Sequence, residues 1–477
     1  MDARSERNAV PLAVDLDGTL IATDLLWESL FLLLRRKPLC VFLLPLWLLG
    51  GKARLKCEIA SHVELDAAGL PYRQDLLARL QEDKADGRHI VLATASPKKF
   101  ADAIAAHLGV FDEVISTEPG RNMASEMKRD ALIAAFGDGG FDYAGNSRAD
   151  VAVFDAARGA MIVAPDRAAS RWQAANGGEI IEAPKPTFKT YVKMLRVHQW
   201  LKNSLIFVPL FLSHEYFNMQ LLALCIMAFV AFSTAASAIY ILNDFFDLGL
   251  DRRHPTKRNR PFASGVLSIP FGFAAMLGLL AISGITALFL PPLFGLVLGA
   301  YLIATTAYSL SIKRMLLIDV LTLAGLYTLR ILAGSAATMI GVSFWLLAFS
   351  VFFFLSLALV KRYVELRSTV LPAKERIAGR GYRTEDQDVI AQAGMASAFA
   401  SAMVLALYIQ SSAVRELYAM PWLIWPLCPI VLYITIRIWI LARRDEMHDD
   451  PIVFIISDWR SQLFGLLGAV LLIAAGL

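Results

Sequence analysis

Three carboxylates and an amide stand at the end of a long apolar run. Asn243, Asp244, Asp247 and Asp251 follow residues 219–242, which carry no charge and are long enough to cross a bilayer. On a helix the three aspartates are spaced by three and four residues, so they share one face. Carboxylates placed in this way repel one another unless a cation lies among them, and Mg²⁺ prefers such oxygen ligands. The spacing therefore predicts a Mg²⁺ site at a membrane face.

Basic residues follow the acidic cluster directly. They are Arg252, Arg253, Lys257, Arg258 and Arg260, enough to hold several phosphate oxygens. Acids for a metal and bases for phosphates, both at a membrane face, indicate an enzyme acting on a phosphorylated lipid. The alternative is a loop whose positive charge only sets topology. That alternative explains the basic residues but not the aligned carboxylates.

A second acidic pair follows a short apolar segment near the N-terminus. Residues 9–14 predict a strand, and Asp15 and Asp17 come directly after it in the sequence DLDGT. Such a pair points toward the crevice at the carboxyl ends of the strands, where α/β sheets place their ligands. Later elements add polar residues in a fixed order: Thr94 after the strand 90–93, Lys128 on a helix, and Asn146 and Asp150 after a strand near residue 143.

This ordered set resembles the haloacid dehalogenase (HAD) phosphatase superfamily over about residues 8–182. The resemblance implies that Asp15 is the nucleophile that forms an aspartyl-phosphate and that Asp17 is the general acid and base. It further implies phosphoryl contacts from Thr94 and Lys128. The implied Mg²⁺ ligands are Asp15, the Asp17 carbonyl and the motif that holds Asn146 and Asp150.

The fourth motif departs from the commoner HAD pattern, which has Asp where this chain has Asn146. The amide carries one less negative charge, so we expect weaker metal binding unless Asp150 compensates. We expect a phosphatase; the alternative is a degenerate domain kept for docking or regulation. Residues of about 20–85 would form a helical cap. Its apolar stretch 39–49 is too short to span a membrane and predicts an interfacial helix or the apolar face of the cap.

Composition divides the chain into a soluble part and a membrane part. Of the 477 residues 57% are hydrophobic, mean hydropathy is +0.53, and the net charge of +4 gives no indication of nucleic-acid binding. The four cysteines lack metal-site spacing. We expect a soluble domain at 1–182, a linker at 183–194 and a membrane domain at 195–477. Nine spans are expected near 203–217, 219–242, 267–290, 292–309, 315–339, 342–360, 389–411, 419–442 and 461–477.

Lysine and arginine are distributed unevenly over the loops between these spans. The loops after the second, fourth, sixth and eighth spans hold 17 of them, and the intervening loops hold only Arg415. The positive-inside rule therefore places the soluble domain and the acidic cluster on the cytoplasmic side of a multi-pass inner (plasma) membrane protein.

The membrane part, about residues 190–477, resembles the UbiA-type intramembrane prenyltransferase superfamily in its nine spans and its NDxxDxxxD motif. The sequence RVHQWLKN at 196–203, the basic stretch at 251–261 and KRYVEL at 361–366 resemble the polyprenyl-phosphate phosphoribosyltransferase branch. The implied fold is an N-terminal α/β Rossmann-like HAD domain with a helical cap, followed by an all-α polytopic domain of nine transmembrane helices.

Membership of that branch implies transfer of phosphoribose from phosphoribosyl diphosphate to a polyprenyl phosphate. Mg²⁺ on Asp244, Asp247 and Asp251, assisted by Asn243, would hold the diphosphate. The donor's 5-phosphate needs separate cations, for which the candidates are Lys257, Arg258, Lys313 (with Tyr308 five residues before it), Lys361 and Arg362. The HAD domain could then remove the 5-phosphate of the product.

The superfamily's second aspartate-rich motif is absent after the sixth span, where Lys361, Arg362, Glu365 and Arg367 stand, followed by Arg380. This departure weakens the main alternative, which is transfer of an isoprenoid to an aromatic or other small acceptor. A transporter or scaffold with a regulatory HAD domain is the alternative from another class. Asp319 and Arg330 lie within the fifth span, three turns apart, so we expect them to have different partners.

Overall fold

The computed structural model describes residues 9–368, 381–447 and 450–476. The chain forms two compact units: residues up to 194 together with 241–275, and residues 195–240 together with 276–477. Arg380, one of the basic residues noted after the sixth span, lies outside the described residues.

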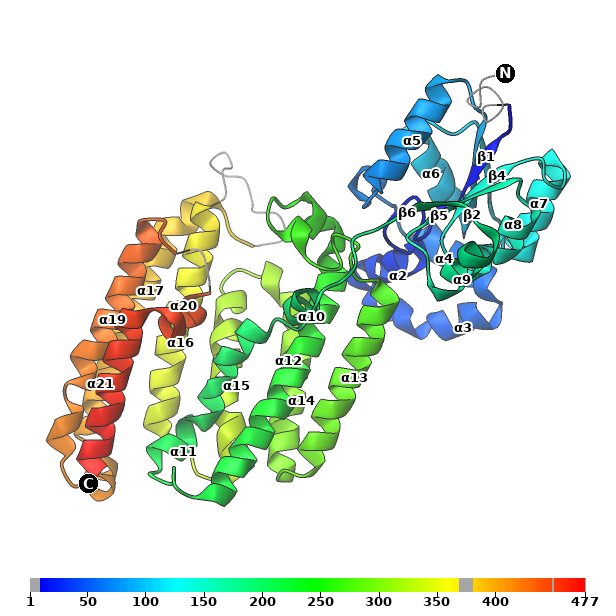
Figure 1. Cartoon of the computed structure of the whole chain (residues 1–477). Coiled ribbons are helices and arrows are strands. Elements are labelled where there is room, and N and C mark those ends of the chain that lie inside the picture. Colours follow the sequence, from blue (N-terminus) through cyan, green and yellow to red (C-terminus); the bar gives the residue numbers. More distant parts are fainter. Residues whose placement is uncertain (1–8, 369–380, 448–449, 477) are drawn as a thin grey trace. The chain divides into compact units, whose positions relative to one another are not determined.

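The first unit contains a six-stranded parallel sheet in the order β3-β2-β1-β4-β5-β6 (Figure 1). Its strands are β1 (Leu12–Val14), β2 (Ile90–Pro97), β3 (Glu113–Thr117), β4 (Asp142–Gly145), β5 (Gly159–Val163) and β6 (Glu179–Ile181). All three residues of β1 are apolar and buried. A strand that is apolar on both faces is typical of a parallel sheet covered by helices on each side. The expected α/β fold is confirmed.

Helices fill the connections of this sheet. They are α2 (Leu25–Arg36), α3 (Leu44–Leu49), α4 (Lys52–His62), α5 (Gln74–Ala85), α6 (Lys98–Leu108), α7 (Glu126–Phe136), α8 (Val151–Ala156) and α9 (Arg167–Asn176), with the short 3₁₀ helices η1 (Pro38–Phe42), η2 (Ala67–Gly69) and η3 (Arg148–Asp150). The long connection between β1 and β2 is thus helical, as expected for a cap. Asp24 caps α2 by accepting hydrogen bonds from the Leu26 and Trp27 amides.

The register of the central strands gathers the expected catalytic residues. β1 lies between β2 and β4, with Val14 opposite both Leu92 and Ala144. The three strands run in the same direction, so their carboxyl ends lie side by side. Asp15 follows β1 and Asn146 follows β4, and both therefore reach the same edge of the sheet.

The second unit is helical, and two helices, α12 and α13, have residues in both units. Its elements are η4 (Val197–Phe207), α11 (Val208–Leu212), α12 (Met219–Arg253), α13 (Ile269–Leu288), α14 (Pro292–Leu310), η6 (Ile312–Arg314), α15 (Ile318–Thr338), α16 (Phe344–Arg367), η7 (Thr384–Asp386), α17 (Gln387–Ile409), α18 (Ser412–Leu417), η8 (Pro421–Ile424), α19 (Leu427–Arg443), α20 (Pro451–Ser457) and α21 (Trp459–Gly476). Two further elements are α10 (Phe188–Leu195), which precedes η4, and η5 (Lys257–Asn259), which follows α12.

Eight helices in the described residues are long and apolar enough to cross a membrane. They match the second to ninth expected spans, and the protein is a multi-pass membrane protein. The first expected span, 203–217, differs: the chain forms the 3₁₀ helix η4 and the five-residue α11 instead. Buried polar residues explain the departure from a regular α-helix, because Lys202 and Asn203 use η4 to reach partners on neighbouring elements.

Close backbone packing fixes η4 in the bundle. Gly334 of α15 lies so near that a Cβ there would stand 1.9 Å from the Ile206 carbonyl oxygen. Small residues permit such approaches between membrane helices. η4 is therefore held against α15, which positions the polar residues described below.

Candidate functional site

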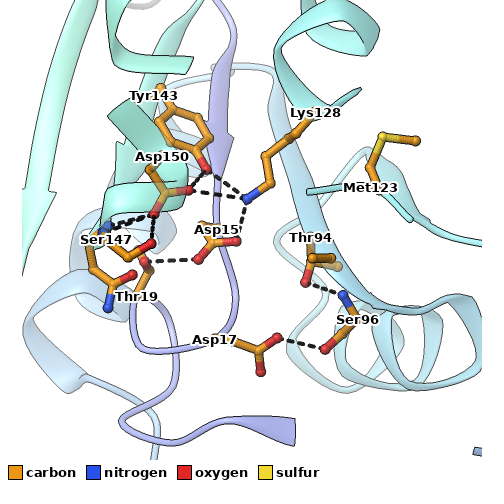
Figure 2. Close-up of polar contacts among 12 residues, drawn as sticks. Asp15, Asp17, Thr19, Thr94, Ser96, Met123, Lys128, Tyr143, Ser147 and Asp150 are labelled. Atoms are coloured by element: carbon orange, nitrogen blue, oxygen red, sulfur yellow. Dashed lines mark hydrogen bonds and ion pairs between the residues drawn. The ribbon is translucent and has the colours of Figure 1, made fainter. Parts of the chain in front are cut away.

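Lys128 is the centre of the polar site at the sheet edge (Figure 2). Its ammonium donates to Asp15 at 2.7 Å, to the Tyr143 hydroxyl at 2.9 Å and to Asp150 at 3.3 Å. All four side chains are buried. Burial alone would lower the pKa of Lys128, but the two carboxylates outweigh it and hold that pKa above its usual value. Lys128 is thus a permanent positive charge beside the expected nucleophile.

Asp150 is a structural carboxylate with every lone-pair direction in use. One oxygen accepts from Lys128 and from Tyr143 at 2.6 Å. The other accepts from the Asn146 amide at 3.1 Å and from the Ser147 amide and hydroxyl at 3.0 and 2.8 Å. Burial favours the neutral form, yet Lys128 and these donors keep the pKa of Asp150 below its usual value. It orients Lys128 and the loop after β4, which leaves little capacity for a metal.

In the two motif aspartates, unlike Asp150, the effect of burial on the pKa outweighs the neighbouring donors and charges. It raises the pKa of Asp15 to about 7, although Lys128 opposes the change. Burial and the charge of Asp24 raise the pKa of Asp17 to about 6. Asp17 accepts from the Leu25 amide at 2.8 Å and from the Ser96 hydroxyl at 2.7 Å. A carboxylic acid with a raised pKa, fixed by two donors beside a nucleophile, suits general acid and base catalysis near neutral pH.

The Asn146 side chain is packed against the motif loop. A Cβ on Gly18, which has φ +80°, would lie 2.2 Å from the Asn146 amide nitrogen. Only glycine fits this approach, and it brings the amide close to the turn that carries Asp15 and Asp17. Asp15, the Asp17 carbonyl and the Asn146 amide offer oxygen ligands that a Mg²⁺ ion accepts. With Asp150 committed to Lys128, this set has less negative charge than we expected from the sequence.

The expected residue Thr94 is fully buried, and its hydroxyl accepts a hydrogen bond from the Ser96 amide at 3.0 Å. Three further residues of this site were not expected, and the first is Ser96, whose hydroxyl donates to Asp17. Lys56 of the cap helix α4 lines the same pocket and donates to the Ala95 carbonyl at 2.6 Å. Arg73 donates to the Gly18 carbonyl and so braces the motif loop. A lone lysine or arginine within a cap has no motif around it, so only the fold could identify these two.

The acidic cluster lies on α12 as expected, and an arginine lies within it. Arg260 contacts Asp251 at 2.6 Å and Asp244 at 3.2 Å through one nitrogen. Asp247 lies 3.6 Å from Arg35. The side-chain oxygen of Asn243 is buried and has no hydrogen-bond partner among the described residues. An amide oxygen is a ligand that Mg²⁺ accepts, and Asn243 precedes Asp244 directly in the sequence. Among the described residues, however, no three Asp, Glu, His or Cys side chains lie close enough together to hold a metal ion, and Arg260 contacts two of the three aspartates.

The basic residues near the cluster have distinct surroundings. Lys257 and Arg258 are exposed on η5, open to a phosphate. Arg252 makes a two-pronged ion pair with Glu28, both largely buried, and is therefore committed. In the second unit Tyr308 lies in the last turn of α14 and Lys313 lies on η6, and each is half-buried.

We expected Arg362 to be available to a phosphate, but its guanidinium is paired with carboxylates of the protein. Its guanidinium is buried and pairs with Asp319 at 2.5 Å and with Glu365. The Tyr382 hydroxyl donates to the same Asp319 at 2.5 Å. Breaking a buried ion pair is costly, so this arrangement favours a structural role for Arg362. Asp319 and Arg330 do have different partners, as expected, because Arg330 donates to Asn203 at 2.9 Å.

In the second unit two lysines contact the same carboxylate, and an arginine lies near one of their partners. Asp450 accepts from Lys202 at 2.7 Å, from Lys361 at 3.0 Å and from the Tyr327 hydroxyl at 3.3 Å. Arg330 and Lys202 lie over the ring of Tyr327, 5.4 and 5.8 Å from its centroid. We call Lys202, Arg330, Lys361 and Asp450 the cationic cluster. No sequence pattern joins Asp450 to Lys202, which lies 248 residues away in the chain.

The charges of the cationic cluster do not balance. It holds three positive groups and one negative group, and Arg330 pairs with no carboxylate in the part of the chain that the structure describes. Lys202, Arg330 and Asp450 are buried, whereas the Lys361 side chain is 42% exposed and opens the cluster to a ligand. Uncompensated buried cations are unfavourable, so this group is suited to bind an anion such as a phosphate.

Comparison with known proteins agrees with both parts of the chain. The UbiA prenyltransferase family model matches residues 204–458, and the haloacid dehalogenase-like hydrolase model matches residues 12–154. The uncharacterized protein y4nM of Sinorhizobium fredii is 39% identical over 96% of this chain and 89% of its own length. The nodulation protein NoeC of Azorhizobium caulinodans is 35% identical over 61% of this chain and 94% of its own length.

A third relative is the decaprenyl-phosphate phosphoribosyltransferase of Mycobacterium tuberculosis, 36% identical over 39% of this chain. That match covers 63% of the relative's length. Among solved structures, a UbiA homolog from Archaeoglobus fulgidus bound to GPP and Mg²⁺ is 15% identical, with a TM-score of 0.45, over 60% of this chain and 98% of that chain. Because the family model and the full-length relative together span most of the sequence, the chain belongs to the UbiA prenyltransferase family and carries an N-terminal HAD-like hydrolase domain.

Proposed function

We propose that the membrane domain transfers 5-phosphoribose from phosphoribosyl diphosphate to a polyprenyl phosphate. The observation that carries this proposal is the cationic cluster, in which Lys202 and Lys361 contact Asp450 and Arg330 lies over the ring of Tyr327, itself a partner of Asp450. Lys361 lies in the segment where the superfamily usually has a second acidic motif. A prenyl transfer that ionises a diphosphate would favour two acidic clusters with two metals. A donor that carries a diphosphate and a separate monophosphate requires a metal for the first and protein cations for the second, and the chain holds residues of both kinds.

The similarity to decaprenyl-phosphate phosphoribosyltransferases supports the same substrates. In the proposed reaction, a phosphate oxygen of the lipid attacks the anomeric carbon of the ribose. The new carbon–oxygen bond forms as the bond to diphosphate breaks, and diphosphate leaves with the electron pair. The nucleophile is already anionic, so no strong general base is required.

The chain's residues would act by binding and orientation. Asp244, Asp247, Asp251 and Asn243 would hold Mg²⁺, which when bound neutralises the departing diphosphate. Lys202 and Lys361 would bind the 5-phosphate, with Arg330 adding positive potential. Lys257, Arg258, Lys313 and Tyr308 remain our candidates for further phosphate contacts.

The HAD domain would remove the 5-phosphate from the lipid-linked product. Asp15 would attack phosphorus and form an aspartyl-phosphate, and protonated Asp17 would give its proton to the departing ribose oxygen. Asp17, now ionised, would accept a proton from the water that hydrolyses the intermediate. Lys128 and the Asn146 region would hold the phosphoryl oxygens and the Mg²⁺. The excess of basic residues in alternate loops supports a cytoplasmic location for both sites in an inner membrane.

The test uses the full chain in detergent with Mg²⁺, a polyprenyl phosphate and phosphoribosyl diphosphate labelled in the ribose. Mass analysis of the lipid fraction separates a phosphoribosyl lipid from a ribosyl lipid. We expect wild type to form the ribosyl lipid, Asp15→Asn to accumulate the phosphoribosyl lipid, and Asp244→Asn to form neither. Glu215→Gln, at an exposed position, is the matched control for removing a carboxylate.

Each result separates one part of the proposal from the other. A phosphoribosyl lipid from wild type, unchanged in Asp15→Asn, would retain the transfer and refute the dephosphorylation. Absence of labelled lipid with folded wild type would refute the transfer. In that case turnover of a polyprenyl diphosphate with an aromatic acceptor would establish the prenyl transfer for which the UbiA family is named.

A further inference from the structure

The cap of the HAD domain exposes an unusual amount of apolar surface. Residues 38–49, the apolar cap segment, comprise η1 and α3. Cys40 and Trp47 are buried in the core of the domain, and Leu44 is half-buried against it. The others are exposed: Leu39 77%, Val41 44%, Phe42 77%, Leu43 42%, Leu46 58%, Leu48 52% and Leu49 86%. A contiguous apolar patch of this kind on a soluble domain marks an interaction surface.

The charges around the apolar cap segment indicate what covers it. Arg36 and Lys37 precede it and Lys52 and Arg54 follow it, and all four are exposed. The sequence holds no Asp or Glu between Glu28 and Glu58. Large apolar side chains with basic flanks and no acid are typical of segments that lie in the interface of an anionic bilayer. The domain is also part of a chain that crosses a bilayer, so a lipid surface is always at hand.

The same segment borders the phosphatase pocket. Leu48 of α3 lines that pocket together with Lys52 and Lys56, and the pocket reaches Asp15 and Asp17. An apolar rim is of little use to a water-soluble phosphate ester. It would accommodate the first part of a lipid tail whose phosphorylated head enters the pocket.

We propose that the apolar cap segment inserts into the cytoplasmic leaflet and presents the phosphatase pocket to a phosphomonoester anchored in that leaflet. Leu39, Phe42, Leu46 and Leu49 would enter the boundary between headgroups and acyl chains, and the flanking basic residues would contact anionic headgroups. The identity of the lipid ester rests on the proposed function, whereas the insertion itself does not.

The insertion is tested by spin labels on the full chain in vesicles of phosphatidylcholine and phosphatidylglycerol. After replacement of the four native cysteines, single cysteines are introduced by Phe42→Cys and Leu49→Cys, with Ala174→Cys on the exposed part of α9 as control. We expect the first two labels to be accessible to oxygen and shielded from a nickel chelate, about 5–10 Å into the interface. The control label should be accessible to the nickel chelate.

Labels at Phe42 and Leu49 as accessible to nickel as the control would overturn the proposal. Shielding from both reagents, with spin–spin broadening that vanishes on dilution with unlabelled protein, would also overturn it and indicate a second copy of the chain. A functional arm uses Leu46→Asp with Leu49→Asp. Hydrolysis of p-nitrophenyl phosphate should be unchanged, and hydrolysis of the phosphoribosyl lipid should fall about tenfold because the effective concentration at the pocket is lost. Inserted labels with a lipid that is never hydrolysed would refute the proposed substrate and retain the insertion.

Discussion

Replacing Asp150 by Asn tests whether this carboxylate acts on catalysis by orienting Lys128. Asp150 lies 3.3 Å from the Lys128 ammonium and is 1% exposed. Two unit charges at that distance interact by about 5 kcal/mol at an effective dielectric constant of ~20. The amide would still accept from the loop amides, but its NH₂ group would face the ammonium.

The remaining interactions reduce the expected cost. Lys128 keeps Asp15 at 2.7 Å, so we expect Asp150→Asn to destabilise the HAD domain by about 2–4 kcal/mol, near the range for a broken buried pair. The phosphatase kcat/KM should fall about 10²–10³-fold, because a misplaced cation no longer stabilises the phosphoryl oxygens.

Tyr143→Phe is the matched control. It removes the 2.6 Å hydrogen bond to Asp150 and the 2.9 Å bond from Lys128 but no charge, so its cost should be about 1–3 kcal/mol, with a smaller loss of activity. The assay is hydrolysis of p-nitrophenyl phosphate by the full chain in detergent, at a temperature where circular dichroism shows each variant folded. A folded Asp150→Asn protein with activity within about threefold of wild type would refute the assigned role, since the charge interaction worked out above could then not govern Lys128.

Three further changes test the other groups. Asn146→Asp should lower the Mg²⁺ concentration for half-maximal phosphatase activity about tenfold, because it adds a negative charge beside the loop that carries Asp15 and Asp17. An unchanged Mg²⁺ titration would exclude Asn146 as a metal ligand. Burial raises the pKa of Asp17 to about 6, so its carboxyl group remains protonated up to that pH. Above pH ~6, kcat/KM for an alkyl phosphate should fall about tenfold per pH unit, because the general acid is lost. The kcat/KM for p-nitrophenyl phosphate should not show this fall, because its leaving group needs no proton. Lys202→Met should raise the KM for phosphoribosyl diphosphate about 10–100-fold. Asp450→Asn should leave that KM unchanged or lower it, while it lowers the free energy of unfolding by about 3–5 kcal/mol. If both substitutions weakened donor binding equally, the cluster would have a purely structural role.

The sequence by itself determined the elements that depend on local pattern. The short apolar strand before Asp15 identified the α/β domain. The order of the polar motifs along that domain identified Lys128 and Asn146 as site residues. Apolar runs identified eight of the nine expected spans. The three aspartates on α12 share a face because helical spacing is a property of the local backbone.

The tertiary structure alone decided which charges meet. No local pattern indicates the ion pairs that form in the folded chain, namely Asp450 with Lys202, Arg362 with Asp319, and Arg260 with the aspartates of α12. The first expected span became η4 because buried polar groups require partners, and those partners lie on other helices. Hydropathy describes the free-energy cost of removing a residue from water, but it does not include the interaction with a buried partner that offsets this cost. The partner depends on contacts between distant segments, so the roles of the charged residues could be assigned only in the folded chain.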